Sequence, residues 1–347
     1  MTARFQQLLH WLQTCPVLRQ AEITRPVPAS NDASFRRYYR LVATTAESSL
    51  SYIVMDAPPQ YENCEPFVRI AGYLQKMGLT IPTVLAQDLS QGFLLLKDLG
   101  DQTYLSQLNA DRVEALYGDA LDALVRMQTQ QGGVANALPI YRADLLQSEM
   151  ALFRDWLLAR YLENPLSTNN HQAWQELTAS LTQSAMRQPQ TFVHRDYHSR
   201  NLMVLPKGNP GILDFQDAVK GPMTYDAVSL LRDCYISWPA KQVRDWQRQY
   251  FLQVVQAGLL AKDEWAGFVK AMDLMGVQRH LKAAGIFARL AIRDGKTGYL
   301  HDIPKTLDYL VSIAACYPET QFLAKWVEED ILPKVLERLA EAEKVSP

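Results

Sequence analysis

The sequence predicts an α+β protein of two lobes, a small N-terminal lobe with an antiparallel sheet and a larger, mainly helical C-terminal lobe. Most of the short β-branched and aromatic runs, which are typical of strands, come before Lys97. Beyond Asp101 almost every segment has apolar residues at helical spacing. We therefore expect an N-terminal lobe over residues 1–97 and a C-terminal lobe over residues 101–347, connected by a hinge at residues 96–100.

The elements expected in the N-terminal lobe follow from local patterns. Amphipathic spacing predicts two helices, Thr2–Gln13 and Glu65–Lys76. Alternating or continuous apolar runs predict four strands, at Phe35–Val42, Leu50–Met55, Pro82–Ala86 and Gly92–Lys97. A polar segment, Pro28–Ser34, is expected to form a loop before the first strand.

In the C-terminal lobe, apolar stripes predict a series of helices. They are expected at Ala115–Gln128, Leu145–Tyr161, His171–Met186, Tyr225–Ile236, Ala240–Gln256, Glu264–Leu290, Pro304–Cys316 and Gln321–Ala342. Gly285 marks a candidate break or kink in one of them. A glycine-containing loop is expected at Gln130–Ala135.

Composition narrows the class of protein. The chain has 347 residues, with 35 basic and 37 acidic side chains and a formal charge of −2, so no bulk field favours nucleic acid. The four cysteines have no paired spacing, which argues against zinc or a redox dithiol. No signal peptide pattern or bilayer-long apolar run is present. We expect a soluble cytoplasmic protein that binds neither nucleic acid nor membrane.

The stretch from Thr191 to Trp238 carries the chemistry. A short strand, Thr191–Val193, leads into a polar loop with Asp196 and, five residues later, Asn201. A further short strand, Ile212–Leu213, is followed directly by Asp214. Phosphoryl transfer needs a carboxylate beside the attacking hydroxyl and oxygen ligands that hold Mg²⁺ against the phosphates. Asp196 suits the first role, and Asn201 and Asp214 suit the second. Turn-forming Asp and Asn residues are the alternative, but three in this order argue against it.

This stretch resembles the catalytic core of the aminoglycoside phosphotransferase and choline kinase superfamily, the small-molecule relatives of protein kinases. The resemblance implies a bilobal protein-kinase-like fold that uses ATP and Mg²⁺. His198 matches a histidine of the pattern that could donate a hydrogen bond to the transferring group; a solvated loop histidine is the alternative. Asp226 matches an aspartate that ties the catalytic loop to the next helix. The hinge that contacts adenine would be Leu96, Lys97, Asp98 and Leu99.

The sequence departs from the kinase pattern in the small lobe. Where a kinase strand carries its phosphate-binding lysine, this chain reads Ile53-Val54-Met55-Asp56, and the loop Pro28–Ser34 has no glycine. A cation must come from elsewhere, and the candidates are Arg36, Arg37 and Arg40. Strand alternation puts Arg36 and Arg40 on one face and Arg37 on the other.

A closer resemblance rests on blocks spread from Asn31 to Leu300. The blocks NDASFRRYYRL, SYIVMDAPP, LLLKDLGD, VHRDYHSRNLM, ILDFQDAVKGPMTYD and QRHLKAAGIFARLAIRDGKTGYL are similar to those of bacterial cell-wall sugar kinases. Those kinases phosphorylate the anomeric hydroxyl of N-acetylmuramate and N-acetylglucosamine. The resemblance implies ATP-dependent formation of the sugar 1-phosphate for peptidoglycan recycling.

Two groups of residues are candidates for binding the acceptor. Helical spacing places four cations on one side of a helix, where one could bind the carboxylate of muramate: Arg279, Lys282, Arg289 and Arg293. A second helix presents Glu149, Phe153 and Trp156 on one face, which could contact sugar hydroxyls and the ring. A solvated cationic face and a core aromatic stripe are the alternatives.

Two other functions stay open from the sequence. One is a kinase of the same fold that acts on an aminoglycoside, choline or another alcohol, although arginines in the substrate lobe do not suit a cationic acceptor. The other is a pseudokinase scaffold, which the missing strand lysine favours and the intact Asp196, Asn201 and Asp214 oppose. We expect a monomer.

Overall fold

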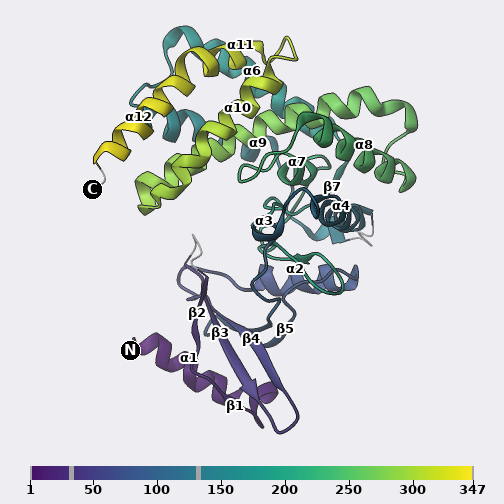
Figure 1. Cartoon of the computed structure of the whole chain (residues 1–347), viewed down its shortest axis with the longest axis vertical. Coiled ribbons are helices and arrows are strands. Elements are labelled where there is room, and N and C mark those ends of the chain that lie inside the picture. The colour runs from purple at the N-terminus through teal and green to yellow at the C-terminus, as the bar shows by residue number, and fades with distance from the viewer. Residues whose placement is uncertain (1, 31–34, 130–133, 346–347) are drawn as a thin grey trace. The chain divides into compact units, whose positions relative to one another are not determined.

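A computed structural model describes residues 2–30, 35–129 and 134–345. Its N-terminal part contains a six-stranded antiparallel sheet with the order β1-β3-β4-β6-β5, in which β2 also pairs with β3 (Figure 1). The strands are β1 (Glu22–Ile23), β2 (Val27–Ser30), β3 (Arg37–Thr44), β4 (Ser49–Asp56), β5 (Val84–Asp88) and β6 (Phe93–Lys97). The expected antiparallel sheet is therefore confirmed. Part of the expected loop Pro28–Ser34 instead belongs to β2, and residues 31–34 lie outside the described residues.

An N-terminal helix, α1 (Ala3–Thr14), covers one face of this sheet and is followed by a short 3₁₀ turn, Pro16–Leu18. Its buried residues Leu8, Trp11 and Leu12 pack in one cluster with Val54 and Phe93 of the sheet. The helix spacing that predicted α1 thus reflects a real apolar face. Helix α2 (Glu65–Lys76) also matches its prediction.

Two compact units divide the chain, Met1–Leu116 with Arg200–Asp217, and Tyr117–Ser199 with Ala218–Pro347. We call them the first and the second unit. The first unit includes α3 (Tyr104–Gln107) and a small hairpin of β8 (Leu202–Met203) and β9 (Gly211–Ile212). The expected division at residues 97–101 differs from this one, because the hairpin pairs with earlier segments at Thr80 and Thr103. The location of the hinge stays a prediction.

Helices dominate the second unit. A two-stranded antiparallel sheet, β7 (Gln190–Val193) with β10 (Val219–Pro222), accompanies them. The α-helices are α4 (Val113–Thr129, which begins in the first unit), α5 (Ala143–Leu152), α6 (Thr168–Arg187), α7 (Tyr225–Leu231), α8 (Ala240–Gln256), α9 (Trp265–Asp294), α10 (Ile303–Ala314), α11 (Gln321–Trp326) and α12 (Leu332–Val345). Short 3₁₀ segments are Val134–Ala137, Lys262–Glu264 and Thr297–Asp302.

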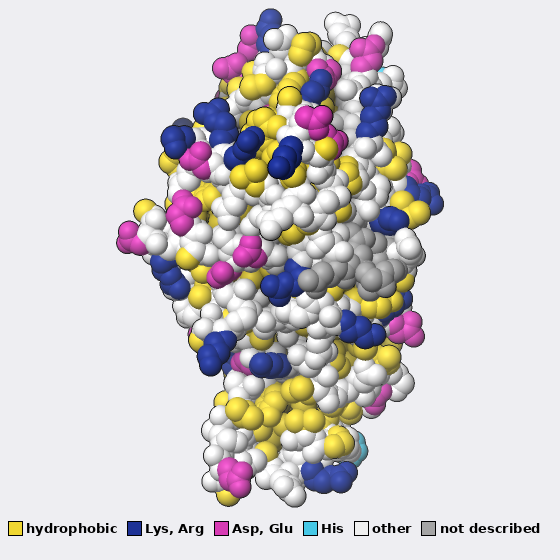
Figure 2. Space-filling model, turned by 90° about the vertical axis from the view of Figure 1, so that its right-hand side faces the viewer, with side chains coloured by type: hydrophobic (Ala, Val, Ile, Leu, Met, Phe, Trp, Pro, Cys, Tyr) yellow, Lys and Arg dark blue, Asp and Glu magenta, His cyan; other side chains and the backbone are white. Residues whose placement is uncertain are grey.

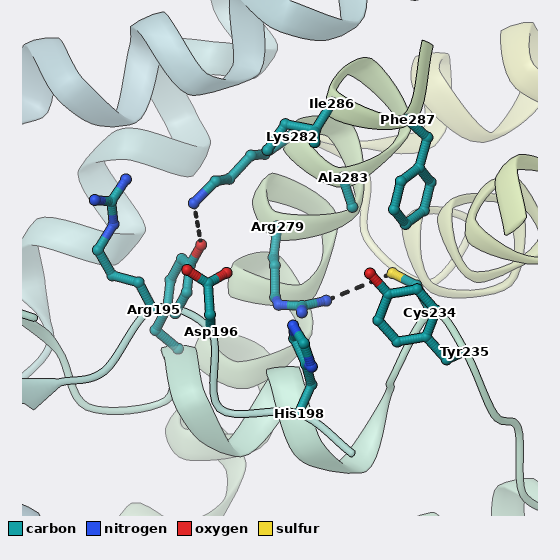
Figure 3. Close-up of a pocket in the computed structure, with 11 residues that line it drawn as sticks. Arg195, Asp196, His198, Cys234, Tyr235, Arg279, Lys282, Ala283, Ile286 and Phe287 are labelled. Atoms are coloured by element: carbon teal, nitrogen blue, oxygen red, sulfur yellow. Dashed lines mark hydrogen bonds between the residues drawn. The ribbon is translucent and has the colours of Figure 1, made fainter. Parts of the chain in front are cut away.

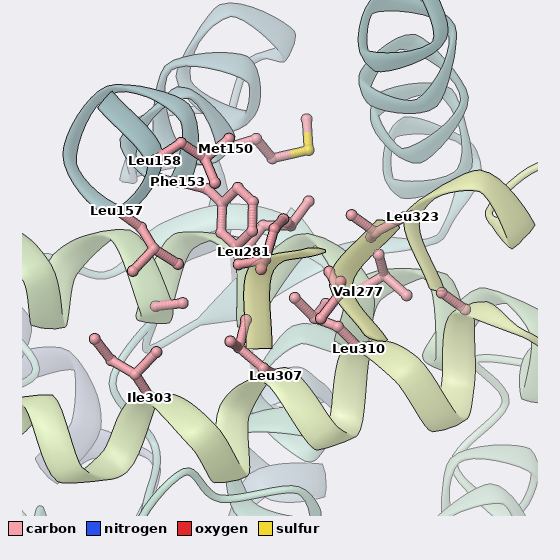
Figure 4. Close-up of a cluster of buried hydrophobic side chains, with 14 of the residues drawn as sticks. Met150, Phe153, Leu157, Leu158, Val277, Leu281, Ile303, Leu307, Leu310 and Leu323 are labelled. Atoms are coloured by element: carbon pink, nitrogen blue, oxygen red, sulfur yellow. The ribbon is translucent and has the colours of Figure 1, made fainter. Parts of the chain in front are cut away.

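Helix α9 forms the centre of the second unit. It packs against α5, α6, α7 and α10, and its residues Val277 and Leu281 join a buried apolar cluster with Phe153 and Leu307 (Figure 4). The helix continues through Gly285 without a break, contrary to the candidate kink. A Cβ at Gly285 would lie 2.3 Å from the carbonyl carbon of Leu152, so this glycine lets two backbones approach closely.

Three expected helices differ in detail from the structure. The expected helix Leu145–Tyr161 changes from α to π geometry at Phe153–Tyr161, and the last expected helix has a π segment at Val327–Ile331. Helix α7 ends at Leu231 rather than Ile236. Apolar spacing cannot distinguish an α from a π register over one or two turns, because both keep one side buried. Residues 130–133 of the expected loop lie outside the described residues.

On the face drawn in Figure 2, acidic and basic side chains lie interspersed, in keeping with the nearly balanced charge. Among the described residues, no helix is both long enough and apolar enough to span a bilayer.

Candidate active site

The loop after β7 carries Asp196, and the carboxylate of Asp226 fixes its backbone. Asp226, in the first turn of α7, accepts hydrogen bonds from the amides of His194 (2.6 Å) and Arg195 (3.0 Å). Arg195 has a left-handed backbone, with a φ of 79°, which is uncommon for a residue with a side chain. The link between the loop and the next helix, expected from the resemblance, is therefore confirmed. Held backbone strain of this kind is typical of functional loops.

His194 has a structural role, as expected. It is fully buried, its ring lies edge-on to Tyr197, and its Nδ1 accepts a hydrogen bond from the Asp196 amide at 3.2 Å. The ring therefore orients the residue that follows Arg195 rather than facing a ligand.

Asp196 lies in a hollow formed entirely within the second unit (Figure 3). The hollow is partly open to solvent, and the space in it that is not filled by atoms is about 430 Å³, open solvent included. Polar groups from the catalytic loop and α9 lie beside aromatic and aliphatic side chains. The lining residues are Arg195, Asp196, His198, Tyr225, Cys234, Tyr235, Arg279, Lys282, Ala283, Ile286 and Phe287.

The charges around Asp196 keep it ionised. Burial works to raise the pKa of its carboxyl, but neighbouring positive charges, that of Lys282 above all, hold that pKa below its usual range. An ionised carboxylate at the wall of a hollow can orient a hydroxyl and accept its proton. This is the role predicted for Asp196.

Glu149 is the centre of a buried network rather than an open ligand. Its carboxylate lies 2.6 Å from Nη2 of Arg195 and 3.0 Å from Nζ of Lys282, and it also accepts hydrogen bonds from Tyr141 and Gln278. Burial works to raise the pKa of Glu149, but these two cations lower it. Both carboxylate oxygens are engaged, so the geometry favours a positioning role over the direct sugar contact proposed from the sequence.

His198 is buried, not a solvated loop residue. Burial lowers the pKa of its imidazole to about 4, despite the nearby carboxylates of Asp233 and Asp196. Its ring lies edge-on to Tyr235, and its Nδ1 has no hydrogen-bond partner among the described residues. At neutral pH the ring is therefore uncharged and its Nε2 or Nδ1 can carry the single N–H.

The structure separates the other candidates of the second unit. Arg279 lines the hollow, whereas Arg289 is half-buried and does not. Arg293 is exposed and pairs with Asp294. Trp156 does not line the hollow either, since it packs against the helical core with Arg160 4.1 Å above its ring.

In the first unit, Asn201 and Asp214 lie together. The side-chain nitrogen Nδ2 of Asn201 is 3.4 Å from Oδ2 of Asp214, and the side-chain nitrogen Nε2 of Gln216 donates to Oδ1 of Asp214 at 2.7 Å. Asp214 has a φ of 60°, a second left-handed residue at a predicted site. A carboxylate and an amide carbonyl are hard oxygen donors, and turning the Asn201 amide over would bring its oxygen toward Asp214. The pair therefore fits a magnesium ion that keeps several water and phosphate ligands.

No group of three or more His, Cys, Asp or Glu side chains with metal-binding geometry occurs in the part of the chain that the structure describes. Mg²⁺ commonly binds through one or two carboxylates together with substrate phosphates.

The three arginines predicted to contact phosphate have different surroundings. Arg40 forms a forked pair with Asp98, with Nε 2.6 Å from Oδ2, and also donates to the Gly100 carbonyl. Arg36 pairs with Glu62 at 3.0 Å, and Arg37 is exposed. Arg40 is therefore engaged in stabilising the predicted hinge. Of the other two, Arg36 is partly buried and Arg37 is exposed, so Arg36 is the better candidate for phosphate.

Burial works to lower the pKa of Arg36, but neighbouring acidic groups raise it, and the net result is a pKa above the ordinary value. Asp214 and Asp217 are among those acids, so Arg36 feels the charge of the predicted magnesium ligand within the same unit.

The predicted hinge residues end strand β6. Leu96 pairs with Ile53 in the sheet and is buried, and the amide of Lys97 donates to the Thr83 carbonyl at 2.9 Å. The Lys97 amide is thus already used, and the backbone of Asp98 and Leu99 remains the candidate for pairing with a base.

A family model described as the phosphotransferase enzyme family matches residues 26–266. The chain belongs to this family and is therefore an enzyme that transfers phosphoryl groups. Relatives that match nearly all of the chain narrow the group further.

A protein of Pseudomonas aeruginosa named N-acetylmuramate/N-acetylglucosamine kinase is 47% identical over 324 residues, which cover 91% of this chain and 94% of the relative. A protein of Neisseria meningitidis with the same name is 39% identical over 90% of this chain and 92% of the relative. Within the phosphotransferases, the chain is thus a member of the family of these amino-sugar kinases.

Solved structures agree on the fold. The ethanolamine kinase of Plasmodium vivax superposes with a TM-score of 0.61 at 11% identity, covering 92% of this chain and 89% of its own. The GDP complex of aminoglycoside 2′-phosphotransferase-IIIa gives 0.58 at 13% identity, covering 88% and 98%. The protein-kinase-like α+β fold expected from the sequence is confirmed.

Proposed function

We propose that this chain transfers the γ-phosphoryl group of ATP to the anomeric hydroxyl of N-acetylmuramate or N-acetylglucosamine. The observation that carries the proposal is the near full-length similarity, at 47% identity, to a kinase named for both sugars. The hollow of the second unit supports the proposal. It combines a carboxylate (Asp196), hydrogen-bond donors and aromatic side chains, and this combination suits a sugar. We place the reaction in the cytoplasm, carried out by a monomer.

The residues of the predicted catalytic, metal and nucleotide sites have distinct roles in this reaction. Asp196 orients the anomeric hydroxyl and accepts its proton, and its lowered pKa keeps it ready to do so. His198 is neutral and can donate one N–H to the incoming phosphoryl oxygen. Asn201 and Asp214 would hold Mg²⁺, which when bound neutralises charge on the nucleotide phosphates. The backbone of Asp98 and Leu99 would pair with the adenine.

An anomeric hydroxyl suits this arrangement. It is a hemiacetal hydroxyl and therefore more acidic than an ordinary alcohol, so a carboxylate of low pKa can accept its proton as phosphoryl transfer proceeds. Arg195 and Lys282 are both paired with Glu149. Their positive charges are therefore held in fixed positions near Asp196.

The test is an acceptor comparison with the purified chain, ATP and Mg²⁺. N-acetylmuramate and N-acetylglucosamine should both be phosphorylated at C1, shown by phosphorus NMR coupling to the anomeric proton and by acid lability of the ester. Choline and kanamycin should give turnover near the no-acceptor rate. Preferential turnover of choline or kanamycin, or a stable phosphate on another sugar hydroxyl, would contradict the proposal.

A further inference from the structure

We infer that Arg279 forms a carboxylate-binding subsite in the hollow of the second unit and so selects acceptors that carry an acidic side arm. In the proposed reaction, on which this inference rests, the subsite would favour N-acetylmuramate over N-acetylglucosamine. The two sugars differ by the lactyl ether, which adds a carboxylate and a methyl group. Arg195, Lys282 and Arg279 all line the hollow. Among these described residues, Arg279 is the one with no ion pair to a carboxylate.

The bonding of Arg279 supports this inference. Its Nε donates to Ser229 and its Nη1 lies 3.6 Å from the sulfur of Cys234, both neutral groups. The side chain is 6% exposed, so water does little to solvate the guanidinium. No carboxylate lies within ion-pair distance of it among the described residues. A buried cation without an anion is costly, and an anionic ligand would remove that cost.

Neighbouring cations differ from Arg279 because each of them forms an ion pair with a carboxylate. Arg195 and Lys282 share Glu149, and Arg232 pairs with Asp273. Asp233 is a carboxylate whose charge acts on Arg279, but its oxygens accept hydrogen bonds from the backbone amides of Ser199 (2.9 Å) and Tyr235 (3.0 Å). Asp233 therefore stabilises the loop, and the guanidinium keeps donor capacity for a ligand.

The wall beside Arg279 suits the methyl group of a lactyl ether. Ala283 and Ile286 follow on the same side of α9 at helical spacing, and Phe287 and Tyr235 lie near them around the hollow (Figure 3). A fork of donors next to an apolar surface matches a carboxylate next to a methyl group. A sugar that lacks the ether would leave both surfaces in contact with water.

Lys282 and Arg293 are less suitable for this role. Lys282 donates to Glu149 and to the Tyr225 hydroxyl at 2.9 Å, so its charge and geometry are fixed inside the protein. Arg293 lies about four turns beyond Arg279 along α9, is exposed and pairs with Asp294. Arg293 is therefore a matched control for a change of Arg279, with the same side chain on the same helix.

The experiment compares three acceptors that differ only in the side arm. They are N-acetylmuramate, its primary amide, in which the carboxylate becomes a neutral group of the same shape, and N-acetylglucosamine. The wild type, Arg279→Met, Arg279→Lys and Arg293→Met are assayed for kcat/KM with each acceptor and for the KM of ATP. Acceptor binding is also measured calorimetrically without nucleotide, and circular dichroism confirms that each variant is folded.

Arg279→Met should lower kcat/KM for N-acetylmuramate by roughly 10- to 100-fold, the value expected for one charge-assisted pair. The loss for the amide and for N-acetylglucosamine should be at least tenfold smaller, so the preference for acid over amide disappears. Arg279→Lys should restore part of this preference, because the charge remains but the fork is lost. Arg293→Met should match the wild type with all three acceptors.

Two results would overturn the inference. Equal losses with all three acceptors together with a higher KM for ATP would assign Arg279 to the phosphates, and an acid preference that survives in folded Arg279→Met would exclude it from the subsite. The binding data separate this from the proposed function. Wild-type binding that favours acid over amide without any phosphorylation would contradict the proposed function and support the subsite.

Discussion

The ammonium of Lys282 lies 3.0 Å from Oε1 of Glu149, and both side chains are buried. The same carboxylate oxygen is 2.6 Å from Arg195, so one acid stabilises two cations that line the hollow with Asp196. A buried pair of this kind contributes little net stability, but removing one partner leaves an uncompensated charge. Glu149 is therefore expected to matter for both stability and the position of Lys282.

Replacing Glu149 with Gln should destabilise the second unit. The buried charges of Lys282 and Arg195 would lose their shared partner, which typically costs about 3–5 kcal/mol. Urea unfolding followed by circular dichroism measures the effect. Asp144→Asn on the same helix is the control, because its pair with Arg142 is solvent-exposed and its loss should leave the midpoint unchanged. Similar midpoints for both variants would show that Glu149 is not the centre of the network.

Asp196→Asn should abolish turnover while nucleotide binding is kept. The amide preserves the shape of the side chain but cannot accept the proton, and positioned bases typically contribute about 10²–10⁴-fold. Neighbouring charges hold the pKa of Asp196 below its usual range. Asp196 therefore stays ionised at the pH values where an ordinary aspartate titrates, and a fall of kcat/KM in that pH range should come from another group. Wild-type turnover in a folded Asp196→Asn variant would remove Asp196 from the catalytic role.

The magnesium requirement should change when either residue of the donor pair in the first unit is altered. Asp214→Ala should abolish activity at ordinary Mg²⁺ concentrations, and Asn201→Ala should raise the concentration needed for half-maximal rate, because each removes an oxygen ligand. Magnesium titration of the rate is the measurement. Asp111→Ala, which removes an exposed carboxylate of the same unit, is the control. Titration curves identical to wild type for both site variants would place the metal elsewhere.

Local pattern was sufficient to predict much of the fold and part of the site. Helical spacing correctly placed Arg279 and Lys282 on one side of α9, where both line the hollow. The same spacing could not tell that Arg289 lies off the hollow, nor that Trp156 faces the core. A periodicity defines a face of a helix, but which segment covers that face depends on tertiary packing.

The network around Glu149 shows a second limit. Three of its partners, Arg195, Gln278 and Lys282, come from segments that are far from Glu149 in the sequence. No short-range signal marks a buried acid that will meet two cations, because such pairs form only after the helices pack. The carboxylate of Asp226 was easier, because its position after the loop matches a pattern.

Stability should fall as the pH is lowered below about 6.5, because two buried histidines resist protonation. Burial lowers the pKa of His198 to about 4 and that of His280 to about 3. Between those values and about 6.5 the unfolded rings bind protons and the folded rings do not, so unfolding is favoured by about 1.4 kcal/mol per pH unit for each ring.

Asp226 opposes this trend over part of the range. Burial raises the pKa of its carboxyl to about 6, so between about 6 and 4 the folded state binds that proton more tightly and gains stability as the pH falls. One group against two leaves a net loss. Urea midpoints from pH 7 to pH 4.5 test this, and folded His280→Asn should show a flatter curve. An unchanged slope in that variant would show that His280 does not stay neutral.

Arg36, just before β3, and Arg40, within β3, should divide into one that serves the nucleotide phosphates and one that supports the hinge. Arg36 is paired with Glu62 and feels the charge of Asp214, whereas Arg40 is fixed to Asp98. The chain has no lysine on β4 to meet the phosphates, so we expect the Arg36–Glu62 pair to take the place of the usual lysine–glutamate pair.

Arg36→Ala should therefore weaken the use of ATP by roughly tenfold or more, since charge-assisted phosphate contacts contribute about 1.5–3 kcal/mol. Glu62→Gln should have a smaller effect in the same direction, because Arg36 stays but loses its orienting partner. The double variant should lose little more than Arg36→Ala alone, as expected for two residues that act as a unit. The KM of ATP and kcat are the measurements, with circular dichroism to confirm folding.

Arg37→Ala is the matched control, because Arg37 is the adjacent residue with the same charge and is exposed. Its KM for ATP should stay at the wild-type value. Arg40→Ala should lower thermal stability, because the forked pair to Asp98 and the bond to Gly100 are lost together. If folded Arg36→Ala and Arg37→Ala use ATP equally well, then neither residue supplies the cation for the phosphates, and Arg200, next to the predicted magnesium ligand Asn201, is the next position to test.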